Sequence, residues 1–400
     1  MSGRLTIDSA ALDRVNRAVD EIRAGRMIVL VDDEDRENEG DLCVAAEAVT
    51  AEAINFMAKH GRGLVCLALD EQQVERLELP LMQAPGHGRP VLGTAFTVSI
   101  EAKQGVSTGI SAADRAHTIR VAVRPDARPS DLVSPGHVFP LRARRGGVLV
   151  RTGQTEGAVD VARLAGLRSA GVICEIMKDD GTMARMPDIE RFAQEHGLRI
   201  LTIADLIQYR LQTERLVCRV EQHRLRLDLT GTDWLASVYE VLVEPRQAVA
   251  LTKGELRPDE PVLCRVHAGS LLGDLFSSTR SEGGANLREA TMRIEREGTG
   301  VVLYLPSQRS LGEELGALAG RSAPPPADSA ASLADGERRT DERSRLRLRT
   351  FGLGAQVLQD LGARKLRLLT NSQRKIAGLS GYGLEIVERV PLVAMRDGHG

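Results

Sequence analysis

The chain carries one strongly acidic segment, DDEDRENEGD over residues 32–41, in which seven of ten residues are Asp or Glu. It follows the apolar run MIVLV and leads into LCVAA, so we expect it to be folded rather than a tail. Carboxylates packed together repel, and a buried ion without a partner costs several kcal/mol. Mg²⁺ prefers oxygen ligands and is the natural compensation. The segment therefore predicts metal-assisted chemistry, with a salt-bridged surface turn as the alternative.

Other segments hold residue types that suit a phosphorylated substrate which exchanges protons. Thr108 lies in the glycine-containing turn of VSTGISAADR, before a predicted helix, and Arg151 and Thr155 lie where RTGQTEGAVD enters another. Helix N-termini bind anions, so both places suit a phosphate. His137, between two prolines in PGHVFPL, and Glu175, inside an apolar strand, are candidate proton carriers. Together these types form a set of metal carboxylates, proton carriers and phosphate binders.

These residues need a scaffold, and hydrophobic periodicity predicts one over residues 1–212. Apolar residues recur at helical spacing from Leu12 to Ile22, and Gly25 is placed to end that helix. Thr202 is placed to cap another. Strands are expected at 27–31, 63–69, 93–100, 146–151 and 171–176, and further helices at 111–119, 155–166, 187–196 and 202–212. This alternation predicts a layered domain of the α/β or α+β class.

A second domain is expected over residues 213–400. LVCRVE, VYEVLVE, PVLCRVH and TGVVLYL are typical of strands, and GGANLREATMRIEREG is typical of a helix with Leu287, Met292 and Ile294 as core positions. The chain is predicted to end as helix, strand, helix and strand. Residues near 318–345 are rich in Ala, Pro, Ser and charge, which predicts a disordered insert. The fold class expected for the whole chain is α+β (mixed α/β), with two layered α-β-α domains.

Composition excludes several functional classes. The 400 residues hold 53 Lys+Arg against 55 Asp+Glu, and only 3% are aromatic, so no nucleic-acid partner is expected. Five cysteines without a C-x-x-C pair argue against a disulfide framework or a thiolate zinc site. No apolar run approaches the roughly 18–20 residues needed to span a bilayer, so no membrane partner is expected. The first residues lack the apolar core of a secretory signal, which makes a cytoplasmic location the expectation.

The motif order over residues 5–211 resembles 3,4-dihydroxy-2-butanone 4-phosphate synthase of the riboflavin pathway. The resemblance runs through DDEDRENEGDL, STGISAADR, PGHVFPL, GGVLVR-G-TE and CEI…DGTMAR. It implies conversion of D-ribulose 5-phosphate to L-3,4-dihydroxy-2-butanone 4-phosphate and formate. It also implies Mg²⁺ or Mn²⁺, no organic cofactor, and a homodimer.

The same resemblance implies roles for individual residues. His137 and Glu175 match the positions essential for the chemistry, and Glu37 and Gln154 match the metal ligands. The substrate-binding set is Arg36, Glu37, Asp41, Thr108, Arg151, Thr155 and Glu175. The family often has histidine where Gln154 stands. A glutamine carbonyl oxygen suits Mg²⁺, so we expect altered metal affinity more than lost activity, with a dead site as the alternative.

Residues 216–393 resemble a degenerate GTP cyclohydrolase II. Three cysteines hold zinc in that family in the pattern C-x10-C-x-C, and Ser270, Ser281 and Gly283 stand at those positions. Serine is a poor zinc ligand and glycine offers no side chain, so no zinc and no GTP hydrolysis are expected. The domain is then expected to keep its fold as an interaction or regulatory module. Two alternatives remain open: a bifunctional enzyme that also hydrolyses GTP, and a non-catalytic scaffold or regulator of the pathway.

Overall fold

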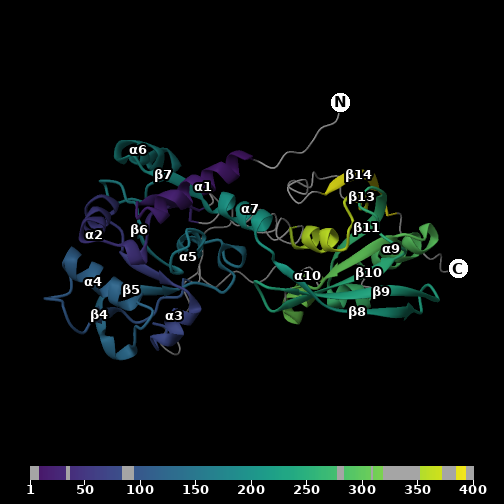
Figure 1. The fold of residues 1–400 in the computed structure, drawn as a ribbon, viewed down its shortest axis with the longest axis horizontal. Coiled ribbons are helices and arrows are strands. Elements are labelled where there is room, and N and C mark those ends of the chain that lie inside the picture. The colour runs from purple at the N-terminus through teal and green to yellow at the C-terminus, as the bar shows by residue number, and fades with distance from the viewer. Residues whose placement is uncertain are drawn as a thin grey trace. The chain divides into compact units, whose positions relative to one another are not determined.

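The computed structural model describes residues 9–32, 37–82, 94–276, 283–307, 310–318, 352–371 and 384–392. The described chain divides into two compact units, and the boundary along the sequence lies between Arg210 and Leu211. Each unit is built on a seven-stranded sheet with helices against it (Figure 1). The predicted mixed α/β class is confirmed. Of the predicted insert near 318–345, all but Leu318 lies outside the described residues.

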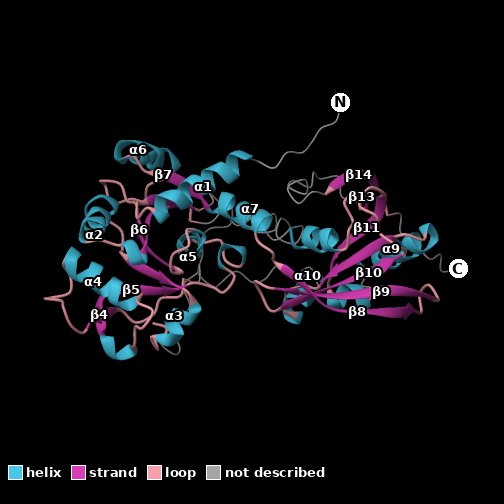
Figure 2. Ribbon diagram, viewed as in Figure 1, coloured by secondary structure: helices cyan, strands magenta, loops and turns pink. Residues whose placement is uncertain are grey.

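The first unit has a mixed sheet with strand order β4-β5-β3-β6-β2-β1-β7. Parallel pairs join β1 to β7 and β3 to β5, and the other neighbours are antiparallel. Figure 2 shows these strands among helices. The strands are β1 (Ile28–Val31), β2 (Gly40–Ala45), β3 (Cys66–Leu69), β4 (Ile100–Ala102), β5 (Leu132–Arg142), β6 (Ala170–Glu175) and β7 (Arg199–Thr202).

Helices cover both faces of this sheet because each face carries apolar side chains. One face packs against α1 (Ser9–Arg23), α5 (Gln154–Leu164) and α7 (Ile203–Thr213). The other packs against α2 (Ala51–Phe56), α3 (Glu71–Arg76), α4 (Ala112–Ala122) and α6 (Met186–His196). Short helical turns are η1 (Ala46–Ala48), η2 (Met57–Gly61), η3 (Pro129–Asp131) and η4 (Gly147–Leu149). Alternate residues of each strand therefore enter two separate cores.

Local signals set several helix ends as predicted. The Thr202 hydroxyl accepts a hydrogen bond from the backbone N–H of Asp205 at 3.1 Å, as an N-cap does. Gly25 follows α1 with a φ of +73°, and Gly197 ends α6 with a φ of +65°. Both conformations favour glycine.

The strand predicted at 146–151 is wrong. Gly146 and Gly147 have φ of 92° and 62°, and the chain turns there into η4. The Asp160 carboxylate accepts a hydrogen bond from the Val148 N–H at 2.8 Å, which holds the turn against α5. The strand predicted at 93–100 is reduced to isolated bridges at Phe96 and Thr97 before β4 begins. Pattern reading missed β2, β5 and β7; β5 contains two prolines, which lack a donor for the strand ladder.

The second unit has strand order β14-β13-β11-β12-β10-β9-β8. Helix α9 (Gly283–Glu297) packs on one face through Ala290 and Ile294. A helix over residues 352–360 lies against Leu303 on the other face. The remaining elements are β8 (Val217–Leu227), β9 (Thr232–Val241), β10 (Arg246–Lys253), β11 (Pro261–Ala268), β12 (Gly300–Leu305), β13 (Lys365–Leu369), β14 (Glu385–Val390), α8 (Leu271–Leu275) and α10 (Leu311–Leu318).

The predicted core of α9 is partly right. Ile294 is fully buried, whereas Leu287 and Met292 are only half-buried and Ala290 and Thr291 fill the core beside Ile294. Strand β10 was missed, and the last predicted helix falls outside the described residues.

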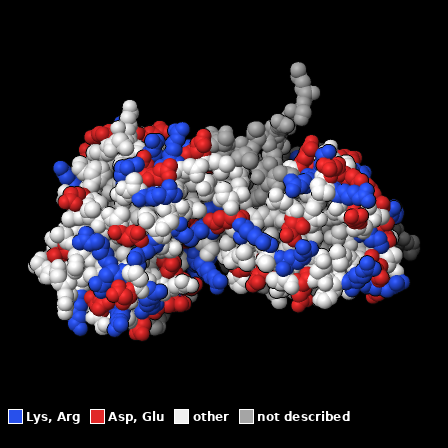
Figure 3. Space-filling model, viewed as in Figure 1, with Lys and Arg blue, Asp and Glu red and all other residues white. Residues whose placement is uncertain are grey.

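The surface bears out the near-balance of charge. On the face drawn in Figure 3, basic and acidic side chains are interspersed, without a large patch of one sign. Within the described ranges, no helix is both long enough and apolar enough to cross a bilayer.

Candidate active site

The acidic segment forms the turn between β1 and β2, and Asp32 braces it. The Asp32 carboxylate accepts hydrogen bonds from the N–H groups of Glu37 at 3.1 Å and Glu39 at 2.8 Å. From the start of α6, the Arg185 guanidinium donates to the carbonyl oxygens of Glu37 at 2.5 Å and Asn38 at 2.6 Å. The turn is therefore folded at its second half. Residues 33–36, with the predicted substrate contact Arg36, lie outside the described residues.

Five carboxylates gather here: Asp32, Glu37, Glu39, Asp41 and Glu175, which we call the acidic cluster. Asp41 on β2 is paired with Glu175 on β6. Burial, together with the negative charge of Glu175 and then of Glu37, raises the pKa of Asp41 well above its usual range. Burial and the charge of Glu37 also raise the pKa of Glu39. Arg185, 3.8 Å from Glu39, opposes the rise at Glu39, but burial and the neighbouring carboxylates outweigh it.

Glu175 is fixed at the end of β6 by the chain that enters β3. The Leu64 N–H donates to Glu175 Oε2 at 2.8 Å. A Cβ at Gly63 would fall 2.5 Å from the same oxygen, so only glycine fits there. The nearby thiols are inert, because burial raises the pKa of Cys66 and raises that of Cys174 to about 12. Cys66 is therefore buried like an ordinary apolar side chain.

The sheet places His137 on the same face as Asp41 and Glu175 of the acidic cluster. Cys66 pairs with Phe139 on β5 and with Ile173 on β6. His137 lies two residues before Phe139, Glu175 two residues after Ile173, and Asp41 opposite Glu175 and two residues before Cys43. Side chains two residues apart on a strand point to the same face of the sheet. His137, Glu175 and Asp41 therefore lie on the face that α5 covers, with Phe139, Ile173 and Cys43.

His137 has a buried carboxylate partner that sequence reasoning missed. Its Nδ1 lies 2.6 Å from Glu101 Oε2 on β4, and the exposed fractions of the two side chains are 44% and 9%. The only sequence signal for Glu101 is a lone carboxylate in the apolar run TVSIEA.

Thr108 lies on an exposed turn that is held by Asp114. The Asp114 carboxylate accepts from the Ser107 hydroxyl at 2.7 Å and from the Gly109 N–H at 3.1 Å. A Cβ at Gly109 would fall 2.0 Å from Glu101 Oε2, so this turn rests on the partner of His137. Thr108 and His137 thus belong to one group, joined through Glu101.

The N-terminus of α5 supplies the remaining predicted residues. Gln154 and Thr155 are buried there, and Gln154 Nε2 donates to the carbonyl oxygen of Glu39 at 3.5 Å. The predicted metal ligand Gln154 therefore lies beside the acidic cluster. Arg151, just before the helix, binds Glu156 at 2.6 Å and the Thr94 hydroxyl at 3.1 Å. Glu156 was also missed; burial raises its pKa, against the opposing effect of Arg151.

The arrangement bears on metal binding. In the described part of the chain, no three His, Cys, Asp or Glu side chains are grouped closely enough to form a ready-made metal site. Mg²⁺ does not require one, because it is commonly bound through one or two carboxylates and keeps several waters. The crowding of Asp41 by like charges fits such a cation.

The second unit differs at the positions where zinc ligands were expected. Ser270 caps α8: its hydroxyl accepts from the Gly273 N–H and donates to Glu314 of α10, both at 3.1 Å. Asp274 accepts from Tyr304 at 3.1 Å and lies 3.0 Å from His267 Nε2. Gly283 begins α9, and Ser281 lies outside the described residues. Ser270, Asp274 and Glu314 therefore form hydrogen bonds within this unit.

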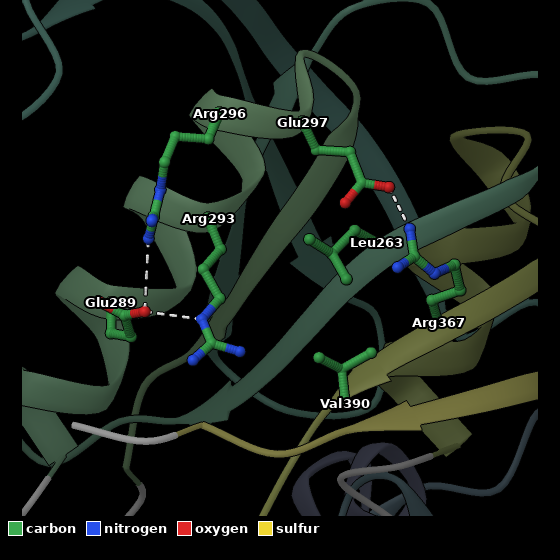
Figure 4. Close-up of a pocket in the computed structure, with 7 residues that line it drawn as sticks. All are labelled: Leu263, Glu289, Arg293, Arg296, Glu297, Arg367 and Val390. Atoms are coloured by element: carbon green, nitrogen blue, oxygen red, sulfur yellow. Dashed lines mark hydrogen bonds and ion pairs between the residues drawn. The ribbon is translucent and has the colours of Figure 1, made fainter.

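A hollow of about 530 Å³ lies between α9 and strands β11, β13 and β14 of this unit (Figure 4). Its arginines are each paired with glutamate. Arg293 and Arg296 both bind Glu289, and Arg367 binds Glu297 and Glu388. This pairing leaves little net positive charge for an anion, so we assign the hollow no ligand.

Comparison with known proteins places the two units in two families. The family model of 3,4-dihydroxy-2-butanone 4-phosphate synthase matches residues 16–209, and that of GTP cyclohydrolase II matches residues 218–391. The chain is 51% identical to riboflavin biosynthesis protein RibBA of Aquifex aeolicus, over 94% of this chain and 92% of that protein. It is 48% identical to a 3,4-dihydroxy-2-butanone 4-phosphate synthase of Pseudomonas aeruginosa, over 95% and 99%.

A solved structure is similar to this chain over both of its units. The crystal structure of RibBX from A. baumannii, a two-domain 3,4-dihydroxy-2-butanone 4-phosphate synthase, has a TM-score of 0.73 and 41% identity, and covers 95% of this chain and 99% of that one. The chain therefore belongs to the 3,4-dihydroxy-2-butanone 4-phosphate synthases, the carbon–carbon lyases of riboflavin biosynthesis, in a form that carries a second domain of the GTP cyclohydrolase II family.

Proposed function

We propose that residues 1–212 convert D-ribulose 5-phosphate to L-3,4-dihydroxy-2-butanone 4-phosphate and formate with Mg²⁺ at the acidic cluster. The observation that carries this is the buried carboxylate of Asp41, which is paired across the sheet with the half-buried Glu175 and crowded by Glu37 and Glu39. Such crowding destabilises an empty site and is relieved by a cation. Mn²⁺, which also accepts oxygen ligands, would serve in its place.

Glu37 and Gln154 are the proposed metal ligands. Both lie at the acidic cluster, and Gln154 is within hydrogen-bond distance of the Glu39 backbone. A bound Mg²⁺ would stabilise the oxygen anions that form when a proton leaves a carbon next to a carbonyl.

The proposed chemistry uses His137, Glu175 and Asp41. Glu175 on β6 lies one strand from Asp41 on β2 and two strands from His137 on β5, and neighbouring strands are about 4.8 Å apart, so Glu175 can act on one small substrate together with either residue. Glu175 and His137 are the proton carriers in this proposal, one removing a proton next to the carbonyl while the other protonates the leaving hydroxyl. Asp41 binds a sugar hydroxyl.

The substrate's phosphate is proposed to bind near the N-terminus of α5. Arg151 and Thr155 lie there, and the positive end of the helix dipole favours an anion. Arg36 and Thr108 complete the proposed substrate contacts.

The test is formate release from D-ribulose 5-phosphate by the full-length chain with Mg²⁺. We expect one formate for each butanone phosphate, with both products measured by NMR of ¹³C-labelled substrate. His137→Asn and Glu175→Gln should abolish turnover without changing the melting temperature by more than a few degrees. Full activity of both variants would overturn the assigned roles, and no product from the unaltered chain would overturn the function.

We further propose that residues 213–400 do not hydrolyse GTP. Ser270 is committed to the α8 cap and to Glu314, and Gly283 offers no ligand atom. GTP incubated with the chain and added Zn²⁺ should stay intact. Its consumption, with one zinc bound per chain, would establish the bifunctional alternative, whereas an inactive first unit would favour the scaffold alternative.

Two expectations about the protein in the cell complete the proposal. We propose that it is a homodimer, as the resemblance to the synthases implies, and that it is cytoplasmic, as its first residues, which lack the apolar core of a secretory signal, suggest. Light scattering on the full-length chain should give twice the monomer mass of 43.4 kDa. A monomer that is fully active would contradict the dimer.

A further inference from the structure

We propose that Glu101 is the positioning residue for His137: its carboxylate holds the Nδ1–H of the imidazole, and so leaves Nε2 as the atom that exchanges protons with substrate. This inference rests on the proposed role of His137. It assigns a role to a residue that neither motif spacing nor the acidic cluster had indicated.

The contact itself is short and anchored. His137 Nδ1 lies 2.6 Å from Glu101 Oε2. The Glu101 side chain is 9% exposed and that of His137 44%, so the carboxylate is fixed in the interior while the imidazole reaches outward. A buried carboxylate must be hydrogen-bonded, and the Thr118 hydroxyl of α4 donates to the second oxygen, Oε1, at 3.4 Å.

The position of Glu101 is set by three elements. Thr118 accepts from the Ala102 N–H at 3.0 Å, which ties β4 to α4. Gly109 leaves no room for a side chain beside Glu101 Oε2. Glu101 therefore joins His137 on β5 to the turn that carries Thr108, and places a proton carrier and a substrate contact in a fixed relation.

A neutral imidazole has one protonated nitrogen, and its hydrogen-bond partner decides which one. A carboxylate accepts but does not donate when it is ionised, so it selects the form with the proton on Nδ1. The lone pair of Nε2 then faces the open side as the base, and the same carboxylate stabilises the imidazolium once Nε2 has taken a proton. No metal or further reactant is needed for this role.

Glu101→Gln is the test, because an amide keeps the shape and can donate to Nδ1, which favours the wrong tautomer. We expect kcat for formate release to fall by about 10²- to 10⁴-fold, with KM for D-ribulose 5-phosphate within about threefold. In a His137→Asn background the same substitution should cost less than about threefold, because the two residues act as one unit. Glu101→Asp, which keeps the charge, should recover part of the loss.

A measurement without turnover separates this inference from the proposed function. Long-range ¹H–¹⁵N NMR of the histidine-labelled full-length chain should show the His137 proton on Nδ1, and on Nε2 in Glu101→Gln. A wild-type proton on Nε2, an unchanged kcat in Glu101→Gln, or equal losses in both backgrounds would each overturn the inference. A wild-type chain that releases no formate would instead refute the proposed function, whatever the tautomer.

Discussion

The acidic cluster of the first unit and the Ser270 region of the second are both polar sites at the ends of strands, but their charges are balanced differently. Around Asp41, burial and then the charge of neighbouring carboxylates, Glu175 first, raise its pKa. Around Ser270, the carboxylates have internal hydrogen-bond donors: Glu314 accepts from Ser270 and Asp274 from Tyr304. A site that awaits a ligand keeps unbalanced charge at a cost in stability, whereas a site without one is free to close on itself.

Among the variants that test this comparison, Glu175→Gln is expected to change activity most. The substitution keeps the shape of the side chain but removes a proton carrier held by the Leu64 N–H. We expect kcat for formate release to fall by at least about 10³-fold. Glu190→Gln, the same change on the exposed side of α6, is the matched control and should be neutral. Equal rates in the two variants would remove Glu175 from the chemistry.

Asp41→Asn should separate activity from stability. Burial and then the neighbouring carboxylates raise the pKa of Asp41 above the unfolded value of about 3.9, so the folded chain binds the proton more tightly than the unfolded chain does. The ionised form then destabilises the fold increasingly as pH rises through and above that value. The variant should lose most activity, yet melt roughly 2–4 °C higher without metal.

The stability gain of Asp41→Asn should also depend on pH and on metal. It should be larger at pH 8 than at pH 5, and Mg²⁺ should reduce it because the cation stabilises only the native carboxylate. Calorimetry of both proteins at each pH, with and without Mg²⁺, gives the difference in melting temperature under all four conditions. A variant that melts lower than the wild type at pH 8 would show that Asp41 is not under electrostatic strain.

Sequence pattern anticipated the elements with strong local signals. Helices α1, α4, α5, α6 and α7 and strands β1 and β6 follow from apolar spacing and caps such as Thr202. Strand β5 was missed because its prolines argue against a strand, and the strand at 146–151 was wrong because Gly146 and Gly147 turn the chain. Such outcomes depend on tertiary contacts, here the Asp160 carboxylate on the Val148 N–H.

The residues of the candidate site also fall into those that were predicted from the sequence and those that were missed. Glu37, Asp41 and Gln154 were predicted as site residues because their motifs resemble those of the synthase family. Glu101 and Arg185 were missed because each acts on a residue far away in sequence. The hydrogen bonds from His137 to Glu101 and from Arg185 to Glu37 span 36 and 148 residues.

A smaller effect is expected in the second unit from Ser270→Ala. The variant loses the cap of α8 and leaves Glu314 without its hydroxyl partner, at a cost of about 1 kcal/mol in the free energy of unfolding. Formate release should be unchanged. A fall in turnover without any loss of stability would show that this region takes part in the synthase reaction.

The smallest effect is expected from Gln154→His, which introduces the residue that the family often has. Imidazole binds Mn²⁺ more readily than an amide does, so the Mn²⁺ concentration for half-maximal activity should fall several-fold, with kcat within about threefold. Titrations of formate release with Mn²⁺ and Mg²⁺ check this. Identical metal curves for both proteins would remove position 154 from the ligand set.

The most direct test of the cation's role is to strip the full-length chain of divalent ions with a chelator and measure formate from D-ribulose 5-phosphate as Mg²⁺ is returned. Turnover should vanish on stripping and recover with a saturating dependence on Mg²⁺, and Glu37→Gln should need more Mg²⁺ for half recovery. Undiminished turnover in the stripped protein would contradict the account, because the acidic cluster would then work without the ion that its charge is arranged to hold.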